Sequence, residues 1–342
     1  MTKKEIVRRV FLASGIVLLA VMLATLVAVG RRRTTEDTTA SAEPKADSAE
    51  AIHILVAGED RTSGLCDVLM LVRVETDAKR ATVLQIPRDT YAAFTDGSYR
   101  KLNGAAKHLG GMAELCDFLS ESFGVPIDRY VLLDGDALRS LVDAIGGVTV
   151  TLPEALDYDD PAQSLSIHLP AGRQTLDGEA AEAFVRYRSG YVRGDLGRMD
   201  AQKMFLASLV RSLRASLDLS SGLRLAASLL PHLHTNLSPG ETLRLVRAAY
   251  AMAEADLLLL TLPGEEAVAT QSGASYYVAS SKATDEILVW YFSASEGSFD
   301  RKQVFRNPRY QHFCAIYDGY SAYTAYPVSE IAEEGIEIEK TP

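Results

Sequence analysis

Residues 52–57 read Ile-His-Ile-Leu-Val-Ala, residues 68–74 read Val-Leu-Met-Leu-Val-Arg-Val, and residues 81–86 read Ala-Thr-Val-Leu-Gln-Ile. Each run is apolar, rich in β-branched and aliphatic residues, and as long as one strand, so the pattern predicts three consecutive β-strands. Thr76-Asp77 supplies turn chemistry between the second strand and the third. We expect the three strands to pair in chain order as an antiparallel meander.

The chain beyond this meander alternates between helical and extended patterns. Helices are predicted at about 105–122 and 136–145, and strands near 129–134 and 148–152. The remaining elements are helices from near Asp177 and near Arg198, helices at 222–231 and 240–254, and a strand at 257–262 before a Pro263-Gly264 turn. The alternation predicts an α/β, mixed α+β domain with a single central β-sheet flanked by helices. We assign residues 51–292 to this domain and residues 293–342 to a tyrosine-rich, acidic C-terminal extension.

The first fifty residues have the pattern of a membrane anchor. Residues 10–29 contain no charge, and a helix of that length spans the roughly 30 Å hydrocarbon core of a bilayer. A buried core helix and a cleaved signal peptide are the alternatives, but the lack of a polar face and the length favour an uncleaved transmembrane helix. Residues 1–9 would then be a short segment on one side of the membrane, and four basic residues before the span against three after it leave the orientation open. Residues 30–50 would be a basic flank and a disordered tether, because 34–50 hold no aromatic or large aliphatic residue.

The charge is distributed unevenly along the chain. Residues 1–33 carry seven basic side chains and one acidic one, whereas the other 309 residues carry 28 basic and 44 acidic ones, a net charge of −16. Such an acidic domain repels polyanions, so the sequence argues against nucleic-acid binding. Cys66, Cys116 and Cys314 have no metal-ligand spacing, and they allow one disulfide without requiring it.

Carboxylates and arginines are predicted to meet at one edge of the meander. In antiparallel pairing, the loop 58–67 and the segment after residue 86 lie at the same end of the strands. The charged residues there are Asp60, Arg61, Asp67, Arg88 and Asp89. Two carboxylates beside an arginine fit Mg²⁺ bridging a phosphate, because Mg²⁺ takes one or two carboxylates and fills its other sites with substrate oxygens and water. The alternative is that these aspartates only form turns and caps.

A second cluster is rich in arginine. Arg186, Arg188, Arg193 and Arg198 fall within thirteen positions of the acidic domain. If 186–188 are extended, Arg186 and Arg188 point to one side. In a helix from about residue 195, Asp195, Arg198 and Gln202 share the face opposite the apolar stripe. Arginine forks bind phosphate oxygens bidentately, so the cluster indicates phosphate binding, and a solvated, salt-bridged helix start is the alternative.

The tyrosines of the C-terminal extension form the last group that we single out. They are Tyr310, Tyr317, Tyr320, Tyr323 and Tyr326. Tyrosine rings can stack on sugars, although such residues more often serve as packing. The sequence leaves both roles open.

Eight segments in chain order resemble one known family. They are Gly58-Glu59-Asp60-Arg61, Asp67-Val68-Leu69-Met70-Leu71-Val72, Ile86-Pro87-Arg88-Asp89, Lys101-Leu102-Asn103, Gly146-Gly147-Val148, Leu176-Asp177-Gly178, Arg186-Tyr187-Arg188, and Asp195-Leu196-Gly197-Arg198 with Gln202. This series resembles the LytR-CpsA-Psr family of cell-wall glycopolymer ligases. The match is good over about 51–215, looser over 216–292, and nearly absent over 293–342.

The resemblance implies a single-pass cell-membrane protein whose bulk is extracytoplasmic. It implies a phosphotransferase of cell-wall biogenesis that moves a sugar phosphate, such as that of a teichoic acid, from a polyprenyl-diphosphate-linked glycan to peptidoglycan. Asp60 and Asp67 would hold Mg²⁺ or Mn²⁺. The diphosphate would be bound by Arg88, Arg186, Arg188 and Arg198, with Asn103 and Gln202 in support. Arg88, Asp89 and Arg198 would be catalytic, with Asp89 orienting the attacking hydroxyl.

Two positions depart from the family's usual pattern. Leu65 stands where an arginine is usual two positions before the second aspartate, and Gln85 stands where serine often precedes Ile-Pro-Arg-Asp. Both carboxylates and four arginines remain, so we expect the chemistry to be retained.

Two other functions compete with the transferase. One is a polyprenyl-diphosphate phosphatase, in which water attacks at the same site. The other is a non-catalytic glycolipid-binding or scaffold protein of the cell envelope. A transcriptional regulator is disfavoured, because the domain is acidic and lacks a basic recognition helix.

Overall fold

The protein is described here from a computed structural model. It describes residues 51–60, 63–152, 154–160, 165–187, 191, 195–216, 225, 229, 233–269, 272–299 and 321–334. The predicted transmembrane helix at 10–29, the tether and Arg188 lie outside these residues, as does most of the helix expected at 222–231. Within the described ranges, no helix is both long and apolar enough to cross a membrane.

The three strands of the meander form as predicted and lie at the centre of the sheet. They are β1 (Ala51–Asp60), β2 (Leu65–Glu75) and β3 (Arg80–Ile86), and both neighbouring pairs are antiparallel. Side chains alternate between the two faces of the sheet, so that Ile54 and Val56 pack into one core while Leu55 and Ala57 pack into the other. Burial on both faces explains why these runs are continuously apolar.

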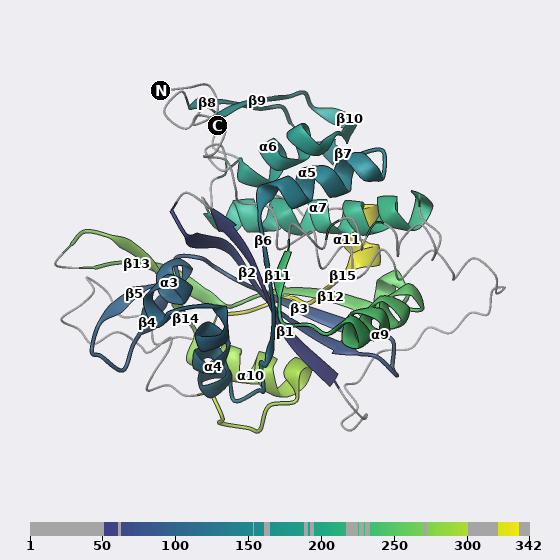
Figure 1. Cartoon of the computed structure of the whole chain (residues 1–342). Coiled ribbons are helices and arrows are strands. Elements are labelled where there is room, and N and C mark those ends of the chain that lie inside the picture. The colour runs from purple at the N-terminus through teal and green to yellow at the C-terminus, as the bar shows by residue number, and fades with distance from the viewer. Residues whose placement is uncertain are drawn as a thin grey trace.

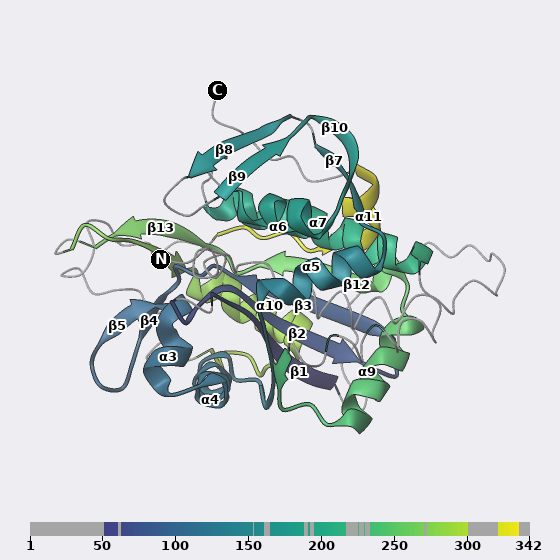
Figure 2. The ribbon, with the colours of Figure 1, turned by 45° about the horizontal axis from the view of Figure 1, so that its top comes forward.

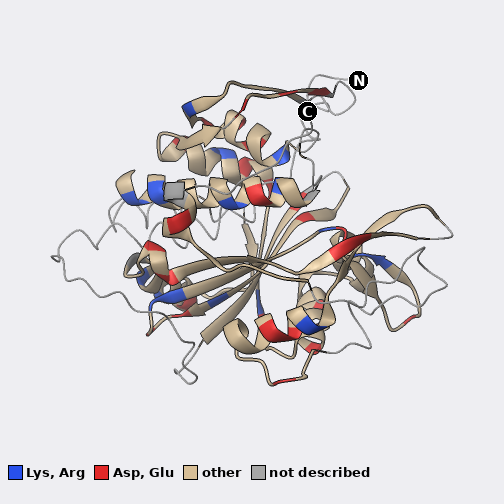
Figure 3. Cartoon of the chain, turned by 180° about the vertical axis from the view of Figure 1, so that it is seen from behind, with Lys and Arg blue, Asp and Glu red and all other residues tan. Residues whose placement is uncertain are grey.

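Four more strands widen this meander into a mixed, seven-stranded sheet of order β11-β6-β1-β2-β3-β12-β15. The added strands are β6 (Arg129–Leu133), β11 (Leu233–Thr235), β12 (Leu257–Thr261) and β15 (Tyr326–Pro327). Strands β6 and β12 run parallel to β1 and β3, whereas the edge strands β11 and β15 are antiparallel to their neighbours. Most of the sheet in Figure 3 is tan, and the charged residues lie mainly on helices, hairpins and strand ends.

Helices cover both faces of the sheet (Figures 1 and 2). One face carries α5 (Gly135–Ala144), α6 (Gly178–Arg186), α7 (Asp195–Ser216) and α11 (Val328–Glu334), and the other carries α3 (Ala105–Leu109), α4 (Met112–Phe123) and α10 (Ser281–Phe292). Helix α9 (Pro239–Tyr250) lies near the starts of β1 and β3. The predicted helix at 105–122 is interrupted at Gly110, whose φ of 112° ends α3 in a left-handed conformation that favours glycine.

Polar caps explain where several helices begin. Asp134 and Asp177 accept backbone N–H groups at the starts of α5 and α6, and Ser280 does so for α10. Ser238 and Glu241 form a reciprocal capping box at the start of α9. The starts of α5, α6 and α9 lie within a few positions of the sequence-based expectations, whereas α10 was not predicted.

The remaining strands form four two-stranded ribbons outside the central sheet. They pair β4 (Tyr91–Ala93) with β5 (Tyr99–Lys101), β7 (Val148–Leu152) with β10 (Gly172–Leu176), β8 (Leu156–Asp160) with β9 (Leu165–Leu169), and β13 (Gly264–Val268) with β14 (Ser275–Ala279). The strand predicted at 148–152 therefore exists, but it pairs with β10 over the helices rather than in the central sheet. The expectation of a single sheet holds for the core only.

Part of the C-terminal segment completes the core. Strand β15 pairs with β12 through Leu259 opposite Tyr326, and α11 packs against α7 through the buried Val328 and Ile331. Tyr326–Pro327, which lie in the stretch that the sequence assigns to an extension, thus form the edge strand of the same sheet. This placement brings Tyr323 and Tyr326 close to the start of α7.

Candidate active site

A β-bulge orients the first candidate carboxylate. Gly58 pairs with Val68 and Glu59 pairs with Cys66, so Asp67 is an extra residue in β2 with no partner in the register. A bulge of this kind bends the strand and changes the direction of a side chain. The Asp67 carboxylate is only 9% exposed, and it accepts a 2.7 Å hydrogen bond from Nη1 of Arg88. The predicted meeting of Asp67 and Arg88 is therefore confirmed.

The turn after β3 is fixed by main-chain hydrogen bonds. The carbonyl of Arg88 accepts a 2.9 Å bond from the N–H of Asn103, and the carbonyl of Asp89 accepts a 2.8 Å bond from the N–H of Tyr277. The Asp89 carboxylate lies 2.9 Å from Nζ of Lys101 and 3.8 Å from Nε of Arg88. These contacts fix the backbone at Arg88 and thereby restrict the positions that its guanidinium group can occupy.

The first turns of α7 supply the second arginine. Arg198 and Gln202 share one face as the spacing predicts, but they are 3% and 4% exposed rather than solvated. The alternative of a solvated helix start is therefore wrong, because the sheet and neighbouring helices enclose this end of α7. Nε2 of Gln202 donates a 3.1 Å bond to the carbonyl of Val185, which ties α7 to the end of α6.

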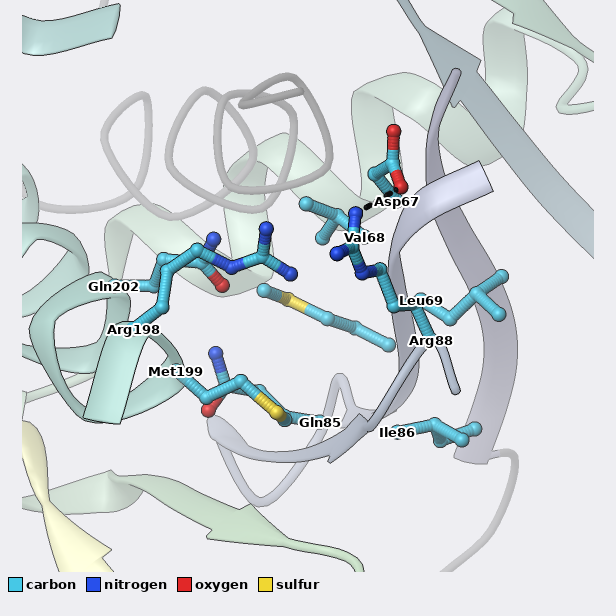
Figure 4. A pocket seen from close by; sticks show the side chains of 10 residues that line it. Asp67, Val68, Leu69, Gln85, Ile86, Arg88, Arg198, Met199 and Gln202 are labelled. Atoms are coloured by element: carbon cyan, nitrogen blue, oxygen red, sulfur yellow. Dashed lines mark hydrogen bonds and ion pairs between the residues drawn. The ribbon is translucent and has the colours of Figure 1, made fainter. Parts of the chain in front are cut away.

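These groups surround a small cavity of about 10 Å³, which is the size of one water molecule. Its lining includes Asp67, Met70, Gln85, Arg88, Arg198, Met199 and Gln202. In Figure 4 the guanidinium groups of Arg88 and Arg198 enter from opposite walls, and a dashed line joins Arg88 to Asp67. Among the described lining residues there are two cations and one carboxylate. The described lining residues thus carry an excess of positive charge, which favours an anion over a cation.

Gln85 is a lining residue that the sequence analysis noted only as a departure from a pattern. It is 2% exposed, and its Oε1 has no hydrogen-bond partner among the described residues. A buried amide without a partner is costly unless a ligand or water satisfies it. The sequence feature that could have identified Gln85 is its position as a polar amide near the end of the otherwise apolar run 81–86.

Arg186 occupies a different position from the one expected. It is the last residue of α6 rather than part of an extended segment, because the helix that Asp177 caps continues to this position before Tyr187 leaves it. Its Nη1 lies 3.7 Å from Oε1 of Glu182, whose other oxygen contacts Nε of Arg139. Burial raises the pKa of Glu182 to about 7, against the opposite influence of the two arginines. Arg186 is therefore buried beside a carboxylate and does not line the cavity.

Two further candidates contribute through the backbone in the described structure. Asn103 lies in a short 3₁₀ turn (Leu102–Gly104), and its main chain supports Arg88, while its side chain is not part of the cavity lining. Asp60 ends β1 opposite Leu65, so its backbone lies at the same edge of the sheet as Asp67. Arg188 lies outside the described residues, and the side chain of Asp60 is not described.

The carboxylates suit a hard cation that is shared with a phosphate. The described part of the chain holds no group of three or more His, Cys, Asp or Glu residues that could bind a metal by itself. Mg²⁺, however, is usually held by one or two carboxylates together with substrate oxygens and water. Asp67 at the cavity and Asp60 at the end of the adjacent strand fit that donor chemistry. The metal assignment itself stays a prediction.

The cysteines offer no alternative nucleophile among the residues described. Cys66 and Cys116 are free and buried, and burial raises the pKa of each thiol to about 12. Thiols with so high a pKa are poor nucleophiles at neutral pH, because the thiolate is the reactive form. Cys314 lies outside the described residues.

The described structure is thus a mixed α+β domain with helices on both faces of its central sheet and two arginines converging on one small cavity. The LytR_cpsA_psr family matches residues 21–289, which is most of the chain, and the chain therefore belongs to the LytR_cpsA_psr family. The resemblance seen in the eight sequence segments is confirmed.

Named relatives agree with this assignment. TagV of Bacillus subtilis, a polyisoprenyl-teichoic acid–peptidoglycan teichoic acid transferase, is 31% identical over 206 residues, covering 58% of this chain and 52% of TagV. LcpA of Corynebacterium glutamicum, a cell wall biosynthesis protein, is 32% identical over 217 residues, covering 56% of this chain and 41% of LcpA. The chain thus spans about half the length of these curated relatives.

Solved structures share the fold. The crystal structure of B. subtilis TagV aligns with a TM-score of 0.59 at 25% identity, covering 70% of this chain and 95% of that one. The protein gbs0355 of Streptococcus agalactiae aligns with a TM-score of 0.61 at 21% identity, covering 74% of this chain and 89% of that one. The central sheet and its helical layers are therefore those of the family.

Proposed function

We propose that this protein is a phosphotransferase that moves a glycopolymer, as a sugar phosphate, from a polyprenyl-diphosphate carrier to peptidoglycan. The observation that carries the proposal is the convergence of Arg88 and Arg198 on one small cavity beside Asp67. Membership of the LytR_cpsA_psr family and the transferase name of TagV support it. A diphosphate carries the charge that such a cavity attracts, and arginine forks match its oxygens.

The cavity is too small for a diphosphate while the side chains stand as described. Arg88 donates to Asp67 over 2.7 Å, and the remaining space is the size of one water molecule. We infer that the ligand's phosphate oxygens replace the Asp67 carboxylate as acceptors for Arg88. Arg198 would then contact the phosphate from the opposite wall. Exchange of one anion for another keeps the buried guanidinium paired, which avoids the cost of an isolated charge.

The reaction is an in-line displacement at phosphorus. An oxygen of an acceptor sugar hydroxyl forms a bond to the phosphorus next to the donor glycan, while the bond to the bridging oxygen breaks and polyprenyl phosphate leaves. Arg88 and Arg198 stabilise the charge that develops on the diphosphate. Asp89, held by Lys101, orients the hydroxyl, whose proton passes to solvent. Phosphoryl transfer asks a protein mainly for positioning and electrostatics, so a strong base is not required.

The metal and the membrane belong to the same proposal. Asp60 and Asp67 would hold Mg²⁺ or Mn²⁺, which would neutralise diphosphate charge when bound. Residues 10–29 would anchor the chain in the cell membrane with its bulk extracytoplasmic, which places the site where a polyprenyl-linked donor is available. Arg186 and Arg188 would complete the electrostatic field around the diphosphate.

The test is a transfer assay with the full chain in detergent. A synthetic polyprenyl-diphosphate-linked saccharide and peptidoglycan oligomers are incubated with and without Mg²⁺, and mass spectrometry identifies the products. We expect a metal-dependent peptidoglycan product that carries sugar phosphate. Release of polyprenyl phosphate without a glycan adduct would replace the proposal with a phosphatase, and tight lipid binding without turnover would replace it with a scaffold.

A carboxylate variant tests the metal assignment. Asp67→Asn keeps the size of the side chain but removes its charge, so we expect transfer to fall at least tenfold and the Mg²⁺ concentration for half-maximal activity to rise. Asp117→Asn on the exposed face of α4 is the matched control and should match wild type. Unchanged Mg²⁺ dependence in Asp67→Asn would show that this carboxylate holds no metal.

A further inference from the structure

A second cavity lies beside the arginine cavity, on another side of α7. Its volume is about 410 Å³, which falls within the roughly 300–1,000 Å³ that is usual for ligand sites. Its lining comes from the first turns of α7, the end of β12 with the start of β13, Tyr277 of β14, and residues 321–326. The described function leaves this cavity without a role.

The two cavities are neighbours through two direct connections. Met199 lines the arginine cavity, and the next residue, Asp200, lines the second one. Gln85 in the arginine cavity is the register partner of Thr261 in the second one, and paired strands lie about 4.8 Å apart. A ligand in the second cavity would therefore reach the anion site across the width of roughly one strand.

The lining of the second cavity has a different chemistry from that of the anion site. Lys203 is 4% exposed, and its Nζ lies 2.7 Å from Oδ1 of Asp200 and 5.4 Å from the ring centroid of Tyr326. Its positive charge is thus already balanced by a carboxylate and an aromatic face. A polyanion gains little from such a site, whereas a neutral ligand with hydroxyl groups can use both the donor and the acceptor.

Aromatic and hydroxyl groups complete the wall. Tyr277, Tyr323 and Tyr326 line the cavity, and Tyr277 donates its hydroxyl to the carbonyl of Leu262 over 2.7 Å, so that its ring is held in place. Oγ1 of Thr261 is buried without a hydrogen-bond partner among the described residues. Rings beside polar groups are the surface that binds the apolar faces and hydroxyls of sugars.

The C-terminal wall is anchored rather than loosely placed. The hydroxyl of Ser321 donates to the carbonyl of Gly264, and its N–H donates to the hydroxyl of Ser280, each over 3.4 Å. Gly264 permits a close approach of strands, because a Cβ there would lie 2.3 Å from the carbonyl oxygen of Val278. Tyr326 is held in β15 by pairing with Leu259. These contacts preorganise the tyrosines around the cavity.

We propose that this second cavity is the subsite for the acceptor saccharide, and that it binds neutral sugars of a glycan strand. The identification of this saccharide as the acceptor rests on the proposed transferase function. The inference that a saccharide binds here rests only on the residues that line the second cavity. Residues 321–326 then serve the reaction by presenting an acceptor hydroxyl toward the diphosphate that Arg88 and Arg198 bind.

The test measures saccharide binding directly, with the full chain in detergent. The probe is the N-acetylglucosamine tetramer, titrated by isothermal calorimetry. We expect binding to wild type, and at least tenfold weaker binding to Tyr323→Leu, which removes the ring but keeps an apolar side chain, and to Asp200→Asn. Trp290→Leu is the matched control, because Trp290 is 55% exposed on α10 and outside the cavity lining. Melting temperatures establish that each variant folds.

A second titration, with inorganic diphosphate, separates this inference from the proposed function. Tyr323→Leu should bind diphosphate as wild type does, and in the transfer assay it should raise KM for peptidoglycan oligomers at least tenfold while leaving KM for the lipid donor unchanged. Saccharide binding without any transfer would support the subsite and refute the transferase. The subsite would be overturned if wild type catalyses transfer and Tyr323→Leu has the same KM for the acceptor. It would also be overturned if wild type binds no saccharide.

Discussion

Replacing Arg198 with methionine tests the electrostatic role of the anion cavity. Arg198 is 3% exposed and faces Arg88 in a space that holds one water, with Asp67 as the one carboxylate among the described lining residues. Methionine keeps the apolar stem of the side chain and removes its charge and its hydrogen-bond donors. The substitution therefore removes the interaction with a diphosphate while preserving most of the packing.

The expected loss follows from the burial of the group. A preorganised donor aimed at developing charge in a water-excluded site contributes about 2.7–4 kcal/mol, which corresponds to about a 10²–10³-fold loss of rate. The stability of the fold should change far less, because the variant also relieves repulsion between two nearby cations. We expect the free energy of unfolding to change by less than about 2 kcal/mol, or several degrees in Tm.

The assay is transfer of sugar phosphate to peptidoglycan oligomers by the full chain, with initial rates measured at saturating acceptor. Arg211→Met is the matched control, since Arg211 lies in the same helix with a side chain that is 44% exposed. It should retain wild-type rates. A rate for Arg198→Met within threefold of wild type would refute the assignment of this arginine. A large drop in Tm would show that Arg198 instead stabilises the fold.

Two further predictions concern stability. Burial lowers the pKa of His53 to about 4 from 6.5, so the unfolded chain takes up the proton first, and stability present above pH 6.5 is lost as the pH falls toward 4. The loss in the free energy of unfolding is on the order of 3 kcal/mol. Denaturant unfolding of His53→Phe should show a smaller decrease in this free energy between pH 6.5 and pH 4. A decrease equal to that of wild type would contradict the argument. In α6, a Cβ on Gly178 would lie 2.6 Å from the carbonyl oxygen of Arg139, so Gly178→Ala should lower stability by about 1–3 kcal/mol. Gly240→Ala, whose Cβ meets nothing within 4 Å, should not lower the Tm, and equal Tm values for the two variants would refute the clash.

Much of the fold could be read from local patterns. The apolar runs of β1, β2 and β3 predict a buried meander because only a sheet covered on both faces needs uninterrupted aliphatic strands. Asp134 and Asp177 mark helix starts because their carboxylates satisfy backbone N–H groups. The ribbons could not be predicted as such, because a strand like β7 has the same local pattern whether it joins the central sheet or pairs outside it.

The site was predictable in its residue types and only partly in its arrangement. Spacing placed Asp67 and Arg88 at one edge of the sheet, and the structure brings them to 2.7 Å. The same reasoning considered residues 186–188 as an extended segment, whereas the structure has Arg186 at the end of a helix beside Glu182. Helical periodicity fixes which residues share a face, but it does not say what covers that face, so the burial of Arg198 could not be inferred.

The sequence by itself determined the family, the central strands and the charged residues that meet at their ends, because these depend on residue type and short-range spacing. The tertiary structure alone decided three further features. It turns Asp67 inward through a bulge, encloses Arg198 between sheet and helices, and brings residues 321–326 beside α7. The bulge depends on how β1 pairs with β2, and the other two features depend on contacts between segments far apart in the chain. No local pattern encodes the energies of these contacts.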